Sequence, residues 1–393
     1  MRDWTKQTFK PESATVLLVI VVFLSILNYF MLSLTLSIML VSVIVVFTIA
    51  HLYHKYVTLD LVNKRKIIRV FPDESVTVPF NISGKSIVAL FYGKLSFRLS
   101  NTVRLTNAQF EIERNEDTEY YLDVSSGRKD HHLHIQAKKR GRAVMRQIEI
   151  QVFDPLFIGN SSFLFKPFYG TEILILPKMT PVKGIEKLVT YQVGNQPNSH
   201  SYFQDPLLIS GIRGYQHTDS FQQIHWKASA RTGELQTKIL EKTTHLKWTI
   251  LLNVLEDQEY HSYSLSFSRN LENHISHIAY LLQIAEKQGI SVELFVNILA
   301  KNHFQLLHLE EGAGKEHVIR GLELLARIDY SSATLKPERF LKRVESKLAG
   351  SFCVILCGIT KQEVLKTTSD KRIHTLPYYE LQASDEGGAL LRC

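Results

Sequence analysis

The sequence predicts a multi-domain protein: an N-terminal transmembrane α-hairpin, then an all-β, sandwich-like domain, then an α/β domain with a mostly parallel sheet. Three observations carry this prediction. Residues 13–54 contain no Asp, Glu, Lys or Arg. Residues 56–176 alternate apolar and polar side chains over short stretches, as half-buried strands do. Residues 247–393 alternate strand-like apolar runs with helical periodicity.

The apolar N-terminal stretch, which gives a first domain over residues 1–55, is long enough for two membrane helices. At about 1.5 Å per residue it is roughly twice as long as the ~30 Å hydrocarbon core of a bilayer. We place a turn at Leu27-Asn28-Tyr29, its least apolar point, with helices over 14–25 and 32–53. A cleaved signal peptide is the weaker alternative, because the run is far too long for one.

Basic residues flank both ends of this hairpin, whereas its turn carries no charge. The flanking side chains are Arg2, Lys6 and Lys10 before it and Lys55, Lys64, Arg65, Lys66 and Arg69 after it. The positive-inside tendency therefore predicts a multi-pass cell-membrane protein whose termini and soluble domains face the cytoplasm.

Residues 56–176 predict a β-sandwich-like domain without a convincing helix. We expect strands at 76–78, 94–99, 109–112, 120–124, 132–136, 148–152 and 173–176, with turns such as Ser83-Gly84-Lys85 between them. His132 and His134 share one strand face near His131, but no acidic or cysteine partner has a spacing that supports a metal site, so we expect a solvated strand. The basic side chains of this region favour contact with anionic lipid over nucleic acid, and a solvated face without a partner is the simpler alternative to both.

Turn-forming residues make 177–210 a predicted linker with one short helix at 185–191, and the segment 211–246 follows it. In the α/β domain, 247–393, we expect strands at 248–254, 290–296, 303–309 and 352–357. We expect helices at 271–285, 318–325, 336–348 and 361–373. Strands that alternate with helices favour a sheet covered on both faces.

The segment Gly211 to Leu235, GIRGYQHTDSFQQIHWKASARTGEL, concentrates cations and aromatic side chains between two predicted strands. Asp219 is the expected N-cap of a helix, with Gln222 as its capping-box partner, and Gly233 is the expected stop. The periodicity places Phe221, Ile224 and Ala228 against a core and Gln223, Lys227 and Arg231 on another face.

This segment is the predicted partner-binding site. The candidate residues are Arg213, Tyr215, Asp219, His225, Trp226, Lys227 and Arg231. Their cations suit a carboxylate, a phosphate or an acidic loop of a partner protein. The alternative is structural: Arg213 and Asp219 pair with each other to fix the turn, and Trp226 packs as a plug.

The segment resembles the signature of domain-of-unknown-function family fifty-eight, a group of membrane-anchored proteins. The resemblance rests on Arg213, Tyr215, Asp219, Ile224, His225, Trp226, Ala228, Ala230, Arg231, Gly233 and Leu235, and more loosely on 139–142 and on Asp154-Pro155-Leu156-Phe157. The sequence departs at Thr218, where a glycine is usual, at Gln222, where an arginine is common, and at Ile158-Gly159. These departures weigh against an anion-binding role of the turn.

The resemblance implies a von Willebrand factor A-like fold for the C-terminal domain and a MoxR-type AAA+ ATPase as partner. Such domains often bind a divalent cation through an Asp-x-Ser-x-Ser loop. The corresponding loop here reads Asn253-Val254-Leu255-Glu256-Asp257 and lacks both serines. We therefore expect no metal and no other cofactor.

The amino-acid composition limits the possible functions but does not identify one. The net charge of +8 suits an anionic surface, either lipid or nucleic acid. Cys353 and Cys357 lie about 13 Å apart along a predicted strand, too far for a disulfide, which together with Cys393 favours a reducing compartment.

We expect a non-catalytic, membrane-anchored adaptor that binds no small-molecule substrate and no nucleic acid. Two alternatives remain: a hydrolase or transferase with His225 as general base, and nucleic-acid binding, which the charge and Trp226 support. The sequence offers no nucleophile paired with a base. Gly312-Ala313-Gly314-Lys315 lacks the leading glycine and the hydroxyl residue of a phosphate loop, and His274 and His277 are expected at the surface.

Overall fold

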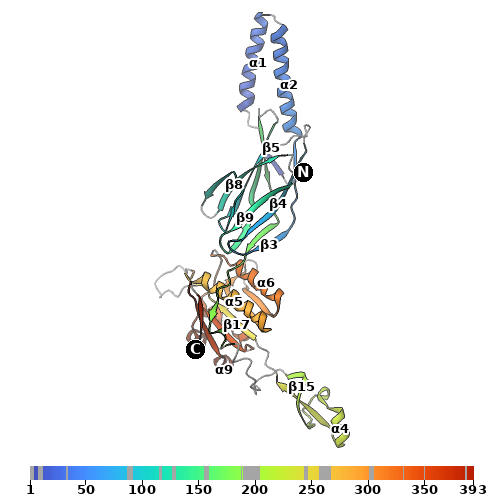
Figure 1. The fold of residues 1–393 in the computed structure, drawn as a ribbon, viewed down its shortest axis with the longest axis vertical. Coiled ribbons are helices and arrows are strands. Elements are labelled where there is room, and N and C mark those ends of the chain that lie inside the picture. Colours follow the sequence, from blue (N-terminus) through green and yellow to red (C-terminus); the bar gives the residue numbers. More distant parts are fainter. Residues whose placement is uncertain are drawn as a thin grey trace. The chain divides into compact units, whose positions relative to one another are not determined.

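The structure, a computed structural model, describes residues 4–7, 12–31, 34–85, 92–114, 117–125, 130–154, 159–186, 188, 204–242, 247–255, 267–300, 305–330, 332–348, 350–385 and 387–393. The chain divides into two compact units, Met1–Lys178 and Met179–Cys393. Figure 1 shows the helices and strands of both. The predicted hairpin and sandwich together form the first unit.

Two helices, α1 (Glu12–Met31) and α2 (Leu34–Tyr56), contact each other at the start of the first unit. Within the described residues, Ser37–Tyr56 is the stretch long and apolar enough to cross a membrane. The predicted turn at Leu27-Asn28-Tyr29 is wrong, since α1 continues through it to Met31. A single asparagine costs a helix little when its neighbours are strong helix formers such as leucine.

Thirteen strands within the described residues form three sheets in the first unit. The largest has the order β1-β12-β11-β5-β8-β7, built from Trp4–Gln7, Asn160–Phe165, Arg146–Phe153, Tyr92–Ser100, Asp117–Ser125 and Phe110–Arg114. The second has the order β2-β4-β9-β6, from Thr58–Leu61, Ser75–Lys85, Asp130–Ala137 and Val103–Leu105. The third has the order β10-β13-β3, from Gly141–Val144, Thr171–Ile175 and Lys66–Val70.

One hydrophobic core joins these sheets, as a sandwich requires. Strand β5 shows the underlying pattern: Leu95, Phe97 and Leu99 are buried, while the side chains between them are less so. They pack in one cluster with Phe80 of β4 and Ile173 of β13. The period-two alternation therefore predicted the β strands of this unit, because it marks the face of each strand that is buried.

Helix α2 does not stop at the edge of this core. Tyr53, 1% exposed, and Val57, 3% exposed, belong to the same cluster of buried side chains as the sandwich strands. The last turn of the apolar helix and the β domain are thus packed as one body. A flexible tether between them would not share a hydrophobic core in this way.

A buried polar cluster, His54 with Asp154 and Ser161, reinforces this junction. The Nε2 atom of His54 lies 3.2 Å from the carboxylate of Asp154, and its Nδ1 atom lies 3.1 Å from the hydroxyl of Ser161. The same carboxylate accepts a 2.6 Å hydrogen bond from the backbone N–H of Gly159. All three side chains are nearly inaccessible to water, and the ammonium of Lys6 donates to the backbone carbonyl of His54.

The second unit contains a seven-stranded sheet with the order β14-β22-β21-β20-β17-β18-β19. Its strands are Val182–Lys183, Gly388–Arg392, Tyr378–Gln382, Cys353–Cys357, Lys247–Leu252, Ser291–Leu299 and Leu306–Gly312. The central pairings β21-β20-β17-β18 are parallel, whereas β18-β19 and β21-β22 are antiparallel. The sheet is therefore mixed around a parallel centre. Strand β14 takes part in it, so the predicted linker 177–210 includes an element of this unit.

Among the described residues, five helices accompany this sheet: α5 (Leu271–Gln288), α6 (Lys315–Ala326), α7 (Pro337–Leu348), α8 (Lys361–Thr367) and α9 (Lys371–His374). Leu251 of β17 packs in one cluster with Phe340 of α7 and Val364 of α8. Successive residues along a strand point to opposite faces. Because Ile250 and Leu252 are buried as well as Leu251, both faces of β17 are covered. Gly289 ends α5 with a φ of 68°, as the sequence predicted.

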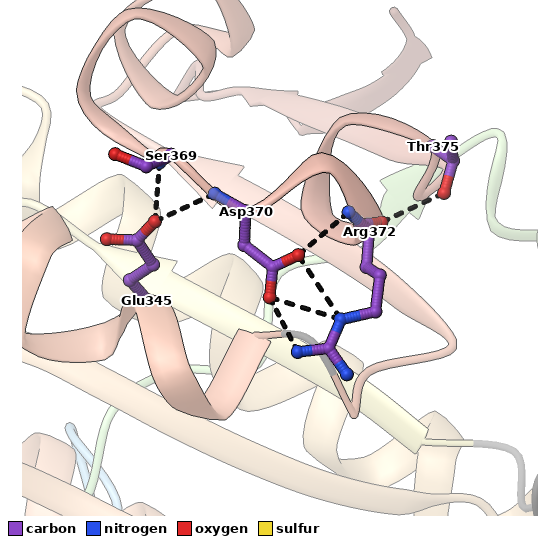
Figure 2. A network of polar contacts seen from close by, with 5 residues as sticks. All are labelled: Glu345, Ser369, Asp370, Arg372 and Thr375. Atoms are coloured by element: carbon purple, nitrogen blue, oxygen red, sulfur yellow. Dashed lines mark hydrogen bonds and ion pairs between the residues drawn. The ribbon is translucent and has the colours of Figure 1, made fainter.

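The single helix predicted over 361–373 is two helices in the structure. Figure 2 shows the contacts at the start of the second helix: the carboxylate of Glu345, on α7, accepts hydrogen bonds from the backbone N–H groups of Ser369 and Asp370. The carboxylate of Asp370 then caps α9 and pairs with Arg372 at 2.8 Å. A distant glutamate thus fixes a local break that the periodicity of 361–373 does not show.

His274 and His277 are buried rather than at the surface, so that prediction is wrong. Both belong to the face of α5 that packs inward. The Nδ1 atom of His277 lies 3.2 Å from the backbone oxygen of Thr180, and its Nε2 atom lies 3.3 Å from that of Ser384. Burial lowers the pKa of His274. Cys353 and Cys357 are buried and free, and burial raises the pKa of both thiols.

Candidate partner-binding site

The predicted site lies on a two-stranded antiparallel hairpin, β15 (Gln204–Gly214) and β16 (Gln236–Lys242). Between the strands the chain forms a short 3₁₀ helix, η1 (Phe221–Gln223), and α4 (Trp226–Thr232). We call residues 204–242 the signature hairpin. Among the side chains described within 211–240, Ile224 and Thr237 are the buried ones. The signature hairpin therefore has almost no core of its own.

The carboxylate of Asp219 organises the turn that follows β15. It accepts hydrogen bonds from the guanidinium of Arg213 at 2.7 Å, from the backbone N–H of Gln216 at 2.9 Å and from the hydroxyl of Thr237 at 3.2 Å. The backbone N–H of Gln216 and the guanidinium of Arg213 hold the pKa of Asp219 below its ordinary value. Arg213 is thus paired within the hairpin, as the structural alternative proposed.

His225, not Asp219, is the N-cap of α4. Its Nδ1 atom accepts a 3.1 Å hydrogen bond from the backbone N–H of Ala228, so the expected position of the cap was wrong. Asp219 is drawn away because Arg213 and Gln216 offer it charge-assisted and backbone donors. The C-cap was predicted correctly: Gly233 ends α4 in the left-handed conformation with a φ of 76°.

The exposed surface of the signature hairpin is aromatic and cationic. Phe221, which the periodicity placed against a core, is 70% exposed. Trp226, which the structural alternative treated as a packing plug, is 65% exposed. Tyr215 stacks obliquely near Phe221, with ring centroids 6.0 Å apart. Lys227 and Arg231, four residues apart on α4, are exposed. Of the core face expected from periodicity, Ile224 alone is fully buried.

The structure therefore divides the seven predicted residues by what they do locally. Arg213 and Asp219 fix the turn, and His225 caps α4 through Nδ1. Trp226, Lys227 and Arg231 are exposed to solvent, and Tyr215 is half-buried. Sequence reasoning missed the exposure of Phe221. A turn of 3₁₀ helix followed by an extended residue breaks the 3.6-residue period on which that assignment depended.

A second cluster of polar side chains lies at the ends of the parallel strands of the second unit. Asn253 follows β17, and its side-chain oxygen accepts hydrogen bonds from the amide of Asn297 at 2.9 Å and the backbone N–H of Leu255 at 3.3 Å. Its NH₂ group donates to the carbonyl of Gly358 at 3.0 Å. Both asparagines are buried. Within the described residues, no group of three or more His, Cys, Asp or Glu side chains could hold a metal ion.

Residues 211–342 match the model of a family described as "Protein of unknown function DUF58". The match confirms the resemblance inferred from the signature residues. It covers most of the signature hairpin and continues through β17, α5, β18, β19 and α6 into α7. No curated protein matches the chain.

Solved structures with distant similarity include the CaDoc0917–CaCohA2 complex at pH 5.5, with 12% identity and a TM-score of 0.19, covering 30% of this chain and 99% of that chain. A type I cohesin–dockerin complex from Clostridium thermocellum has 8% identity, a TM-score of 0.19 and the same coverage. The solution structure of CaCohA2 from Clostridium acetobutylicum has 13% identity and a TM-score of 0.16, covering 30% of this chain and 90% of that chain.

Proposed function

We propose that this protein is a non-catalytic, membrane-anchored adaptor whose signature hairpin docks a partner protein. The exposed aromatic and cationic surface of that hairpin is the observation that carries the proposal. A folded element that leaves Phe221 and Trp226 largely in water, with Lys227 and Arg231 exposed on the same short helix as Trp226, has the composition of a binding surface. Interfaces are enriched in exposed aromatic side chains and arginine, and truncating them costs the most affinity.

The anchor of the proposed adaptor is the pair of helices α1 and α2. We propose that both cross the bilayer and that the termini and soluble units lie in the cytoplasm. The length and apolar composition of Ser37–Tyr56 support the membrane location. The basic residues on both flanks of the pair support the orientation.

The second unit serves as the body of the adaptor, and we propose that it is a von Willebrand factor A-like domain without a working cation site. Its parallel central strands and the helices that cover them support this assignment. At the position where such domains hold a cation, the oxygen of Asn253 already accepts two hydrogen bonds. A neutral amide that is used in this way is a poor ligand for magnesium, which prefers carboxylates and water.

The partner that the family resemblance favours is a MoxR-type AAA+ ATPase. In this proposal, an acidic and partly apolar surface of the ATPase receives Trp226 while Lys227 and Arg231 steer the encounter. The alternative of a hydrolase or transferase with His225 as general base draws less support, because the Nδ1 atom of His225 is used as a helix cap.

Replacing Trp226 by alanine tests the docking surface. If Trp226 is an anchor of the interface, its loss costs about 2 kcal/mol or more, which corresponds to a roughly 30-fold weaker Kd. The measurement is the binding of a purified MoxR-type ATPase from the same cell to the full-length, detergent-solubilised chain. Phe168 is 63% exposed in the first unit and supplies the matched control, Phe168→Ala, which should bind as the parent does. Equal affinities for both variants would remove Trp226 from the interface.

A further inference from the structure

The junction between α2 and the sandwich determines which end of the β domain lies nearest the bilayer. Asp154 directly follows β11 and contacts His54 in the last turn of α2. Phe153, the final residue of β11, pairs with Tyr92 at the start of β5. The β11 end at Phe153 and the β5 end at Tyr92 are therefore the ends next to the helix.

The opposite end of the sandwich is identified in the same way. Thr58, two residues after α2, pairs with Lys85 at the end of β4. At the other end of β4, Ser75 pairs with Gln136 near the end of β9, and Lys138 follows. From Ser75 to Lys85 the strand extends roughly 33 Å at about 3.3 Å per residue. Lys138 therefore lies far from the helix junction.

The side chains at the helix end have the chemistry of a membrane interface. Tyr56 is 52% exposed, with the ammonium of Lys55 5.5 Å from its ring centre. The rings of Tyr92 and Phe153 lie 6.0 Å apart. Exposed lysines accompany them, namely Lys55 and Lys94. Tyrosine rings favour the depth of the headgroups, and lysines extend towards phosphates while their stems stay on apolar surface.

Two acidic groups at the same end are already engaged within the protein. Asp154 is buried against His54 and the N–H of Gly159. Asp123, which pairs in register with Lys94, accepts a 2.6 Å hydrogen bond from Gln109. The lysines are thus not opposed by an exposed cluster of carboxylates among these residues.

We infer that the helix end of the β-sandwich, marked by Tyr56, Tyr92 and Lys94, rests on the lipid headgroups of the bilayer that α2 crosses. This inference depends on the proposed membrane anchoring and adds a second, peripheral contact to it. The rigid junction at His54 holds the sandwich upright against the surface. The occupant is the phosphate layer of anionic lipid, because lysine and tyrosine side chains both donate to phosphate oxygens and the surface potential attracts the lysines.

Spin labels on the full-length chain test this contact. In a Cys393→Ser background, which leaves only the buried Cys353 and Cys357, a nitroxide is placed by Lys94→Cys or by the matched control Lys138→Cys. Each protein is reconstituted into phosphatidylglycerol–phosphatidylcholine vesicles that contain a nickel-chelating lipid. Nickel at the headgroups should erase the narrow lines of the label at position 94 and leave those of the label at position 138 intact.

A third label separates this inference from the membrane anchoring itself. Ile38, on α2, is 62% exposed, and a nitroxide at Ile38→Cys should contact oxygen more often than water-soluble nickel if α2 is inserted. If the label at position 38 lies in lipid but the label at position 94 is no closer to the headgroups than that at position 138, the inference is wrong and the anchor stands. If the label at position 38 lies in water, both are wrong.

Discussion

Replacing His54 by alanine is expected to weaken the first unit by about 3 kcal/mol, because it removes one partner of a buried pair. The carboxylate of Asp154 would lose its 3.2 Å contact while remaining inaccessible to water, and the hydroxyl of Ser161 would lose its partner as well. A buried polar group left without a hydrogen-bond partner lowers the free energy of unfolding by far more than the net contribution of the lost bond.

Amide hydrogen exchange in β11 and β12 measures this loss, because these strands carry Asp154 and Ser161 or lie next to them. A change of about 3 kcal/mol corresponds to protection lowered on the order of a hundredfold. The control is His51→Ala, the same substitution one turn earlier at an exposed position of α2. Protection that falls no further in His54→Ala than in His51→Ala would show that the junction is not held by this cluster.

Replacing Asn297 by alanine is expected to lower the free energy of unfolding of the second unit by about 3 kcal/mol. The NH₂ group of Asn297 donates to the carbonyl of Leu335 at 2.8 Å and to Asn253 at 2.9 Å, and its oxygen accepts from the N–H of Leu335 at 3.1 Å. The variant removes the side-chain partner of both backbone groups of Leu335, takes one of the two hydrogen bonds from the buried oxygen of Asn253, and opens a cavity where the amide was.

Urea titration reports this change through the fluorescence of Trp248, which is fully buried. Trp4→Phe and Trp226→Phe make it the remaining tryptophan of the three in the chain. Asn273→Ala, which removes an exposed hydrogen bond to Asp385, should cost less than about 1 kcal/mol. An equal cost for Asn273→Ala would contradict the weight given to the buried network.

The same titration tests the absence of a cation site. A ligand that binds the folded state alone raises the free energy of unfolding in proportion to the logarithm of its concentration. Because the oxygen of Asn253 is already used, we expect millimolar magnesium to leave the urea midpoint unchanged. A midpoint that rises steadily with magnesium, and not with sodium at equal ionic strength, would restore the cation site.

Much of this fold is visible in the sequence wherever burial alone decides the structure. The alternation in β5 indicates that one face of the strand is buried, and the uninterrupted apolar run of β17 indicates that both faces are. Both strands were therefore predicted close to their true positions. Gly233 and Gly289 mark helix ends because a left-handed residue is needed there.

The errors occur where a distant partner overrides a local preference. Asp219 has the properties of an N-cap, but Arg213 and Thr237 take its carboxylate. The break before α9 depends on Glu345, and the burial of His277 depends on backbone oxygens far away in the chain. Periodicity within a short window does not contain such contacts. Strands β21 and β22 also went unpredicted, because each is five residues long and mixes apolar with polar or charged side chains.

The central claim is that the signature hairpin, presented by a membrane-anchored chain, touches an AAA+ ATPase. Photo-cross-linking in intact cell membranes tests it most directly, with a photoreactive phenylalanine at Trp226 or, as control, at Phe168, whose exposure is closely similar. We predict that the residue at position 226 cross-links to a MoxR-type ATPase identified by mass spectrometry, and that the residue at position 168 does not. Equal capture of the ATPase from both positions, or none from position 226, would contradict the claim.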